Sequence, residues 1–144
     1  MIFDPANPAD PVAIRAVERL ATDRVAWLTT VTPDGQPQTM PIWFLWEGAE
    51  IVVYGDHRAR RNRNIDANPR VSFHLADNGV GDDVVVIEGT ARFDPDYPPV
   101  PDNPAYLARY GDWIDAQLGG PYQMAQTYSM VIRITPTRGI AFGV

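Results

Sequence analysis

The sequence contains no cysteine and no lysine, and it has no long apolar run. Without cysteine, disulfides, thiolate metal sites and cysteine nucleophiles are excluded. Because no segment has the length and apolarity of a transmembrane helix, we expect no membrane span. The start, MIFDPANPADP, is acidic and proline-rich and lacks the basic and apolar regions of a secretory signal. Together these absences predict a cytoplasmic protein that does not bind membranes.

Positive charge is scarce in this chain. The chain has twelve basic and eighteen acidic residues, so its net charge is −6. This negative charge argues against a nucleic-acid-binding function. All the basic residues are arginine. Either genomic base composition explains this bias, or planar guanidinium groups are used to bind phosphate or carboxylate in a bidentate manner.

Motifs of metal and nucleophilic catalysis are also missing. The chain has no GxSxG, HExxH or GxxxxGK[ST] sequence. Its two histidines, His57 and His74, have no carboxylate at a spacing typical of metal ligands, so we expect no metal site. We expect His57 to line a site and His74 to be structural. If the protein is an enzyme, this composition favours chemistry that resides in a bound cofactor.

The pattern of apolar and turn residues predicts one mainly β domain over residues 1–144. Strands joined by tight turns favour antiparallel pairing, and about six or seven strands with few helices predict a closed or split β-barrel. The predicted strands are 25–31, 36–46, 50–54, 70–76, 84–94, 128–135 and 140–144, with turns at 32–35, 47–48, 77–83 and 136–139. The predicted helices are 11–22, 58–67 and one that opens at 103–104 and ends at 119–121.

Proline and glycine mark the irregular positions of these elements. Asp10 followed by Pro11 predicts a capped helix start. Pro37 and Pro41 lack a backbone donor, so their strand must contain an edge, a bulge or a kink. Gly89 predicts a bulge or a close backbone approach within its strand.

Arginine is concentrated in the segment 55–65, GDHRARRNRNI, where four of the twelve basic residues occupy positions 58–63. We expect Asp56 to cap a helix there. Like charges at helical spacing repel one another, and no glutamate separates them. A helix N-terminus attracts anions, so the segment is either an anion site or a basic face that is solvated or paired with acidic residues elsewhere.

Aromatic residues gather at 43–46. On a strand, Trp43 faces away from Phe44 and Trp46, so the three cannot form one stripe. They are either core and interface residues, or Trp43 borders a planar cofactor beside Pro41.

The run IVVYGDHRARRNRNIDANPRVSFHL resembles the cofactor-phosphate segment of the pyridoxamine 5′-phosphate oxidase-like split β-barrel superfamily. In that pattern Arg61 stands at the usual lysine position and Gly55 where Thr or Ser usually supplies a hydroxyl. TPDGQPQTMPIWFLWEG resembles a second family segment. EGTARF, NPAYLARY and YSMVIRITPTRG resemble the branch of oxidoreductases that use deazaflavin, coenzyme F-420.

The resemblance implies a deazaflavin-dependent oxidoreductase that transfers hydride to a small organic acceptor. It also implies a homodimer with the cofactor between the subunits, so that Gln126 or Tyr128 comes from the partner. The acceptor pocket would form from loops 77–83 and 94–104, and His57 or Tyr128 would donate the proton. The implied cofactor-binding residues are Thr39, Met40, Pro41 and Trp43 beside the ring, Tyr54 and His57 beside the linker, and Arg58, Arg61, Arg63 and Asn64 at the anionic part.

Three other functions remain open at this point. FMN could replace deazaflavin on the same fold, and the extra arginines could compensate for the hydroxyl missing at Gly55. The protein could also bind its cofactor without turnover. A haem-handling or tetrapyrrole-reducing role, which also occurs in the superfamily, is the third.

Overall fold

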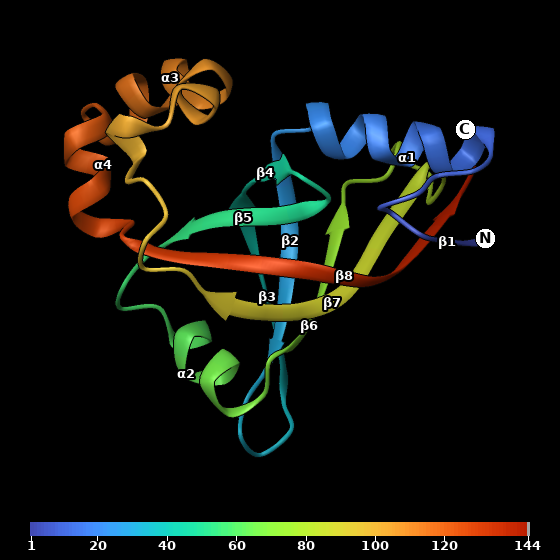
Figure 1. The fold of residues 1–144 in the computed structure, drawn as a ribbon. Helices are drawn as coiled ribbons and strands as arrows, with labels where there is room; N and C mark the ends of the chain where they lie inside the picture. Colours follow the sequence, from blue (N-terminus) through green and yellow to red (C-terminus); the bar gives the residue numbers. More distant parts are fainter. Residues whose placement is uncertain (144) are drawn as a thin grey trace.

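The computed structural model describes residues 1–143, which form a curled antiparallel sheet with helices around it (Figure 1). The strands are β1 (Ile2–Phe3), β2 (Val25–Val31), β3 (Pro37–Trp43), β4 (Leu45–Glu47), β5 (Glu50–Gly55), β6 (Arg70–Leu75), β7 (Val84–Phe93) and β8 (Met130–Phe142). The helices are α1 (Pro11–Thr22), α2 (Arg60–Ala67), α3 (Pro104–Leu118), α4 (Pro121–Thr127) and the 3₁₀ turn η1 (Val100–Asp102).

The sheet has the strand order β3-β2-β6-β7-β8-β5-β4, and the short β1 pairs with β8. Its two end strands, β3 and β4, are consecutive in the chain and are separated only by Phe44. The sheet must therefore curl back on itself to bring its ends together, which makes a half-barrel (Figure 1). The prediction of a mainly β split barrel with about six or seven antiparallel strands is confirmed.

The predicted single strand 36–46 is wrong, because the chain leaves the sheet's first edge at Phe44 and joins its last. The backbone groups freed at this corner are satisfied by α3. The Tyr110 hydroxyl accepts a hydrogen bond from the Phe44 amide at 2.9 Å and lies 2.6 Å and 2.8 Å from the carbonyl oxygens of Arg24 and Phe44. Pro37 and Pro41 lie in β3, an edge strand, as proline requires.

The predicted turn at 136–139 is also wrong, because β8 is a single strand of 13 residues. Pro136 pairs with Gly89 and Arg138 with Glu88, so Thr137 is an extra residue opposite the Glu88/Gly89 step. A bulge and a turn both accept Pro and Gly, so these residues did not distinguish them. The strand predicted from residue 128 begins at Met130, and residue 144 of the predicted last strand lies outside the described residues.

Gly89 makes the close backbone approach expected of it. A Cβ atom at Gly89 would lie 2.5 Å from the backbone oxygen of Thr135. We therefore expect Gly89→Ala to lower the free energy of unfolding by about 1–3 kcal/mol, as overpacking does, measured by chemical denaturation.

Gly111 is the matched control for Gly89. It lies inside α3, where a Cβ atom would meet no described atom within 4 Å. Gly111→Ala should raise the free energy of unfolding by about 0.5–1 kcal/mol, because glycine is a poor helix residue. Equal effects of the two substitutions would contradict the close approach at Gly89.

The helix ends follow local sequence signals in part. The Asp10 carboxylate accepts a hydrogen bond from Ala13 N at the start of α1, as predicted. Asp56 does not cap α2, because its carboxylate binds Arg58 N in a local turn and α2 begins only at Arg60. Gly119 ends α3 in the left-handed conformation, and Pro121 then starts α4, a helix that was not predicted.

Two apolar clusters hold the molecule together. One fills the barrel, and it includes Phe44 and Phe73 in edge-to-face contact. The other joins α3, α4 and η1 to the outer side of β4, β5 and β8, and it includes Tyr54, Tyr106 and Tyr110. None of the helices in the described part of the chain is long and apolar enough to cross a membrane.

Candidate functional site

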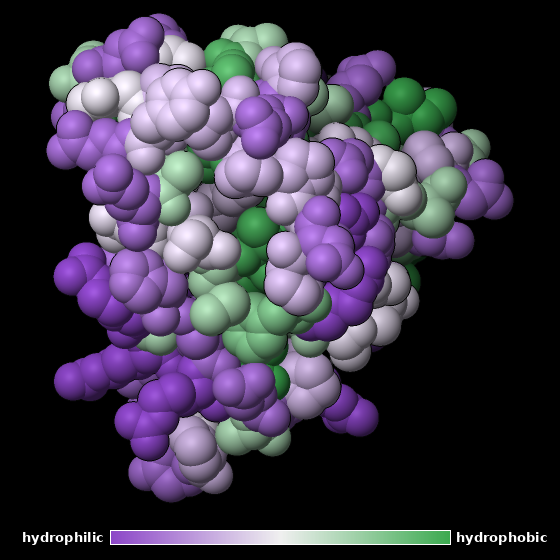
Figure 2. Space-filling view, turned by 60° about the vertical axis from the view of Figure 1, so that its left-hand side comes forward, coloured by the Kyte–Doolittle hydropathy of each residue, from purple (hydrophilic) through white to green (hydrophobic). Residues whose placement is uncertain are grey.

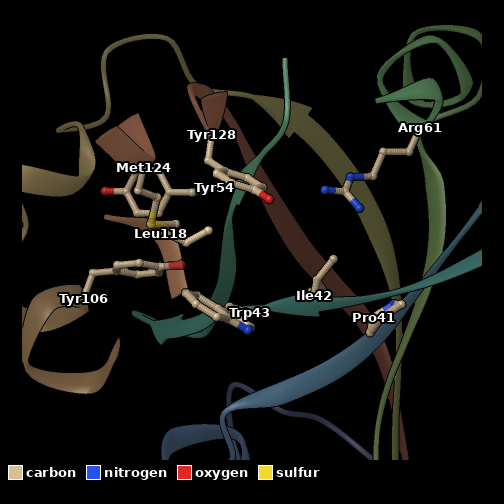
Figure 3. A pocket seen from close by; sticks show the side chains of 9 residues that line it. All are labelled: Pro41, Ile42, Trp43, Tyr54, Arg61, Tyr106, Leu118, Met124 and Tyr128. Atoms are coloured by element: carbon tan, nitrogen blue, oxygen red, sulfur yellow. The ribbon is translucent and has the colours of Figure 1, made fainter. Parts of the chain in front are cut away.

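A cavity lies between the barrel and the helices α3 and α4. It has a volume of about 220 Å³, and we call it the aromatic cavity. Figure 2 shows a hollow with hydrophobic residues at its base on the face that carries α2 and α4. The aromatic cavity is lined by Pro41, Ile42, Trp43, Tyr54, Arg61, Tyr106, Leu118, Met124 and Tyr128 (Figure 3).

A second cavity, the arginine cavity, lies beside the start of α2 and over β2 and β3. Its volume is about 620 Å³. Among residues 1–143, Arg61 alone lines both cavities, so the two spaces meet at this residue. The arginine cavity is lined by Leu28, Thr30, Gln38, Thr39, Met40, Asp56, Ala59, Arg60 and Arg61.

Arg61 is a partly buried cation with no acidic partner within residues 1–143. Its Nε atom is buried and makes no hydrogen bond to any described residue. Burial lowers the pKa of its guanidinium from the ordinary value, and electrostatic attraction to Asp56 and Tyr128 offsets this only in part. A buried charge without a partner is costly, so Arg61 fits an anionic ligand held between the two cavities.

Most other arginines in the described chain form ion pairs with Asp or Glu. The paired ones are Arg15, Arg19, Arg24, Arg58, Arg92, Arg133 and Arg138. Among residues 1–143, none of the three arginines of α2 does so. Pairing with acidic residues elsewhere therefore does not account for the arginines of this helix.

Gly55 makes room for Arg61. A Cβ atom at position 55 would lie 3.3 Å from Nη2 of Arg61 and 3.2 Å from the backbone oxygen of Met130. Where the resemblance leads one to expect a Thr or Ser hydroxyl, this chain thus has a guanidinium close to the backbone. The guanidinium of Arg61 therefore lies against the space that a side chain at position 55 would occupy.

The neighbours of Arg61 have different surroundings. Arg58 is exposed and pairs with Asp56 at 3.3 Å, which raises the pKa of Arg58. Exposed His57 lies with Nδ1 2.9 Å from the carbonyl oxygen of Thr127. Arg63 is exposed. None of these three lines either cavity.

Asn64 is buried and links α2 to the barrel. Its Nδ2 donates hydrogen bonds to Thr30 Oγ1 and Gln38 Oε1, both at 2.9 Å. Both partners line the arginine cavity. Asn64 therefore positions α2 and the wall of this cavity without lining it.

The aromatic cavity has a rigid wall. Trp43 stacks on Tyr110 with ring centroids 5.0 Å apart and an angle of 3° between the planes. Asn103 Nδ2 donates to the Tyr54 hydroxyl at 3.0 Å, and that hydroxyl donates to the Pro98 carbonyl at 2.5 Å. Trp43 packs with the outer cluster while Phe44 and Trp46 belong to the barrel core, so the three aromatics are divided as predicted.

The structure brings together seven of the twelve predicted cofactor-binding residues. Five others lie outside both cavities, and loops 77–83 and 94–104 contribute no lining residue to either one. Tyr128 lines the cavity of its own chain, whereas Gln126 is exposed on α4. The residues in the cavities are Thr39, Met40, Pro41, Trp43, Tyr54, Arg61 and Tyr128, and those outside are His57, Arg58, Arg63, Asn64 and Gln126.

The sequence did not predict that α3 and α4 contribute residues to the aromatic cavity. Tyr106 and Leu118 belong to the apolar face that predicts α3, and the same pattern is typical of a core helix. Met124 lies on the unpredicted α4. No local signal distinguished these cavity residues from core residues.

Residues 1–143 contain no cluster of three or more His, Cys, Asp or Glu side chains that could hold a metal ion.

Comparisons with known proteins agree with this architecture. The pyridoxamine 5′-phosphate oxidase family model matches residues 13–142. A search of curated proteins gave no significant match. A solved F420 reductase is 28% identical, with a TM-score of 0.65 over 85% of this chain and 94% of that chain.

Two further solved structures are similar in fold. An FAD-binding protein from Mesorhizobium loti is 22% identical, with a TM-score of 0.63 over 90% of this chain and 95% of that one. A heme storage protein from Vibrio cholerae is 18% identical, with a TM-score of 0.64 over 92% and 96%. Since the family model spans nearly the whole curled sheet and both cavities, this chain belongs to the pyridoxamine 5′-phosphate oxidase family.

Proposed function

We propose that the protein is an oxidoreductase that binds the deazaflavin coenzyme F-420 and reduces a small organic acceptor. The observation that carries the proposal is Arg61, a partly buried guanidinium without an acidic partner among the described residues, at the junction of two cavities. The similarity of this chain to an F420 reductase supports the choice of cofactor.

Residues that line the arginine cavity would bind the cofactor. Arg61, with Arg60 beside it, would hold the anionic part of the cofactor through charge-assisted hydrogen bonds. Thr39 and Met40 of β3, which line the arginine cavity, would border its ring.

When bound, the deazaflavin supplies a hydride for direct transfer to the acceptor. The protein's own part is to orient the two reactants and exclude water between them. Of the two candidate proton donors, Tyr128 lines the aromatic cavity and His57 does not.

The test is a binding titration of the purified apo protein with coenzyme F-420 and, separately, with FMN. We expect a dissociation constant for coenzyme F-420 in the micromolar range or below, and weaker binding of FMN. Retention of FMN together with no binding of deazaflavin would overturn the proposal. Binding without oxidation of the reduced cofactor by any acceptor in a screen, including biliverdin-like tetrapyrroles, would indicate a binding protein without turnover.

The homodimer implied by the resemblance stays a prediction. Met40 is 60% exposed beside the arginine cavity, where a second copy would cover it. Light scattering should therefore give twice the chain mass of 16.0 kDa. A mass of one chain at micromolar concentration would contradict the prediction.

A further inference from the structure

Tyr106 has a buried hydroxyl group that the fold does not use. The residue is 0% exposed, and its hydroxyl has no hydrogen-bond partner among residues 1–143. Leaving a buried hydroxyl unpaired costs free energy, and such groups are uncommon in folded proteins. The neighbouring tyrosines differ, since the hydroxyls of Tyr54, Tyr97 and Tyr110 all have partners.

The Tyr106 ring is held firmly at the cavity wall. It packs edge-on against Tyr54 with centroids 4.7 Å apart and contacts Tyr110 at 4.8 Å. Its backbone amide donates to Asn103 Oδ1 at 3.2 Å, which anchors the first turn of α3. The side chain therefore cannot easily turn away to find another partner, and Figure 3 shows its hydroxyl directed into the space beside Trp43 and Leu118.

The hydroxyl can act only as a neutral group at ordinary pH. Burial is the main reason that the pKa of Tyr106 is raised far above its usual value. The proton is therefore retained, and the group is available to donate a hydrogen bond into the cavity.

The other residues that line the aromatic cavity indicate which kind of ligand a hydrogen bond from Tyr106 would hold. Trp43, Tyr54 and Tyr128 present aromatic surfaces, and Leu118 and Met124 add apolar ones. Flat aromatic walls favour a planar ring. Of the described residues that line this cavity, Arg61 alone is charged, and Figure 3 shows it on the opposite side of the cavity from Tyr106.

We propose that the aromatic cavity binds the acceptor substrate and that Tyr106 is its orienting hydrogen-bond donor. The substrate class is a planar, uncharged, conjugated ring with a hydrogen-bond acceptor atom on the edge that enters the cavity. This assignment rests on the proposed function, because it gives the arginine cavity to the cofactor and the aromatic cavity to its reaction partner. Tyr106 is then a specificity-determining residue for the reaction.

The test uses two probes of the same shape, quinoline and naphthalene, which differ in one acceptor nitrogen. The full-length protein and Tyr106→Phe are titrated with each probe at a pH where quinoline is neutral, and binding is followed by NMR shifts of cavity residues. Tyr106→Phe should weaken quinoline binding about 3- to 10-fold, the scale of one neutral hydrogen bond, and leave naphthalene binding unweakened. Tyr122→Phe, at a tyrosine that is 78% exposed on α4, is the matched control and should change neither.

Two outcomes would overturn the inference. One is equal quinoline binding by Tyr106→Phe and the original protein. The other is loss of quinoline binding when saturating coenzyme F-420 is added, because the cofactor would then occupy the aromatic cavity. If coenzyme F-420 does not bind at all, the proposed function fails, while the comparison of the two probes still tests the role of Tyr106.

The folding of the variant provides an internal check. Because Tyr106→Phe removes a buried hydroxyl that has no described partner, its denaturation midpoint should be equal to or above that of the original protein. A large drop in the midpoint would mean that the hydroxyl is satisfied within the fold, and it would also overturn the proposal.

Discussion

Arg61→Ala is expected to weaken the binding of coenzyme F-420 by about 1.5–3 kcal/mol, or roughly 10- to 150-fold in the dissociation constant. The substitution removes a partly buried guanidinium that no carboxylate among residues 1–143 neutralises. Hydrogen bonds to charged groups have this magnitude. The measurement is a fluorescence titration of coenzyme F-420 at several salt concentrations, and the salt dependence of binding should also decrease.

Two variants separate a specific contact from general electrostatics. Arg138→Ala removes the same charge from an exposed arginine that pairs with Glu88 at 2.7 Å, and it should leave binding unchanged. Arg61→Lys keeps the charge without the planar fork and should give an intermediate affinity. If Arg61→Ala and Arg138→Ala bind the cofactor equally well, Arg61 is not the anion-binding residue.

Phe44→Ala is expected to lower the free energy of unfolding by about 3–5 kcal/mol, the usual cost of deleting a buried phenyl ring. Phe44 is 0% exposed and meets Phe73 edge-to-face, with centroids 5.0 Å apart. Phe44 lies where β3 ends and β4 begins, so the substitution would leave a void at the corner that joins the two ends of the sheet. Urea denaturation measures the effect.

Phe142→Ala is the matched control for this substitution. Phe142 is 47% exposed in β8, so its removal should cost well under half as much as removal of Phe44. Similar losses for both variants would show that the corner at Phe44 is not a centre of stability.

Local sequence patterns were sufficient for the elements whose stability is local. Asp10 and Pro11 predicted the start of α1, and the alternation in 70–76 predicted β6 almost residue for residue. Errors arose where one local signal serves two structures. Pro136 and Gly139 are typical of a turn but occur here in a bulged strand, because pairing with β7 continues on both sides of the bulge.

The candidate site was predicted only in part, because here too one local signal fits two structures. The position of the arginine cluster and the β3 wall followed from the sequence and its family resemblance. The cavity residues of α3 and α4 did not, because an aromatic residue that lines a cavity and one that fills a core have the same helical spacing.

By itself, the sequence determined the fold class, the place of α2 and the unusual concentration of arginine there. Only the tertiary structure decided that these arginines lack acidic partners among residues 1–143, and that Arg61 is the one that is partly buried between the two cavities. Arg15 finds its partner Asp83 68 positions away, and Arg92 finds Glu50 42 positions away. Charge pairing depends on distances in space that the curl of the sheet creates, so no local pattern could reveal that Arg61 is left without a described acidic partner.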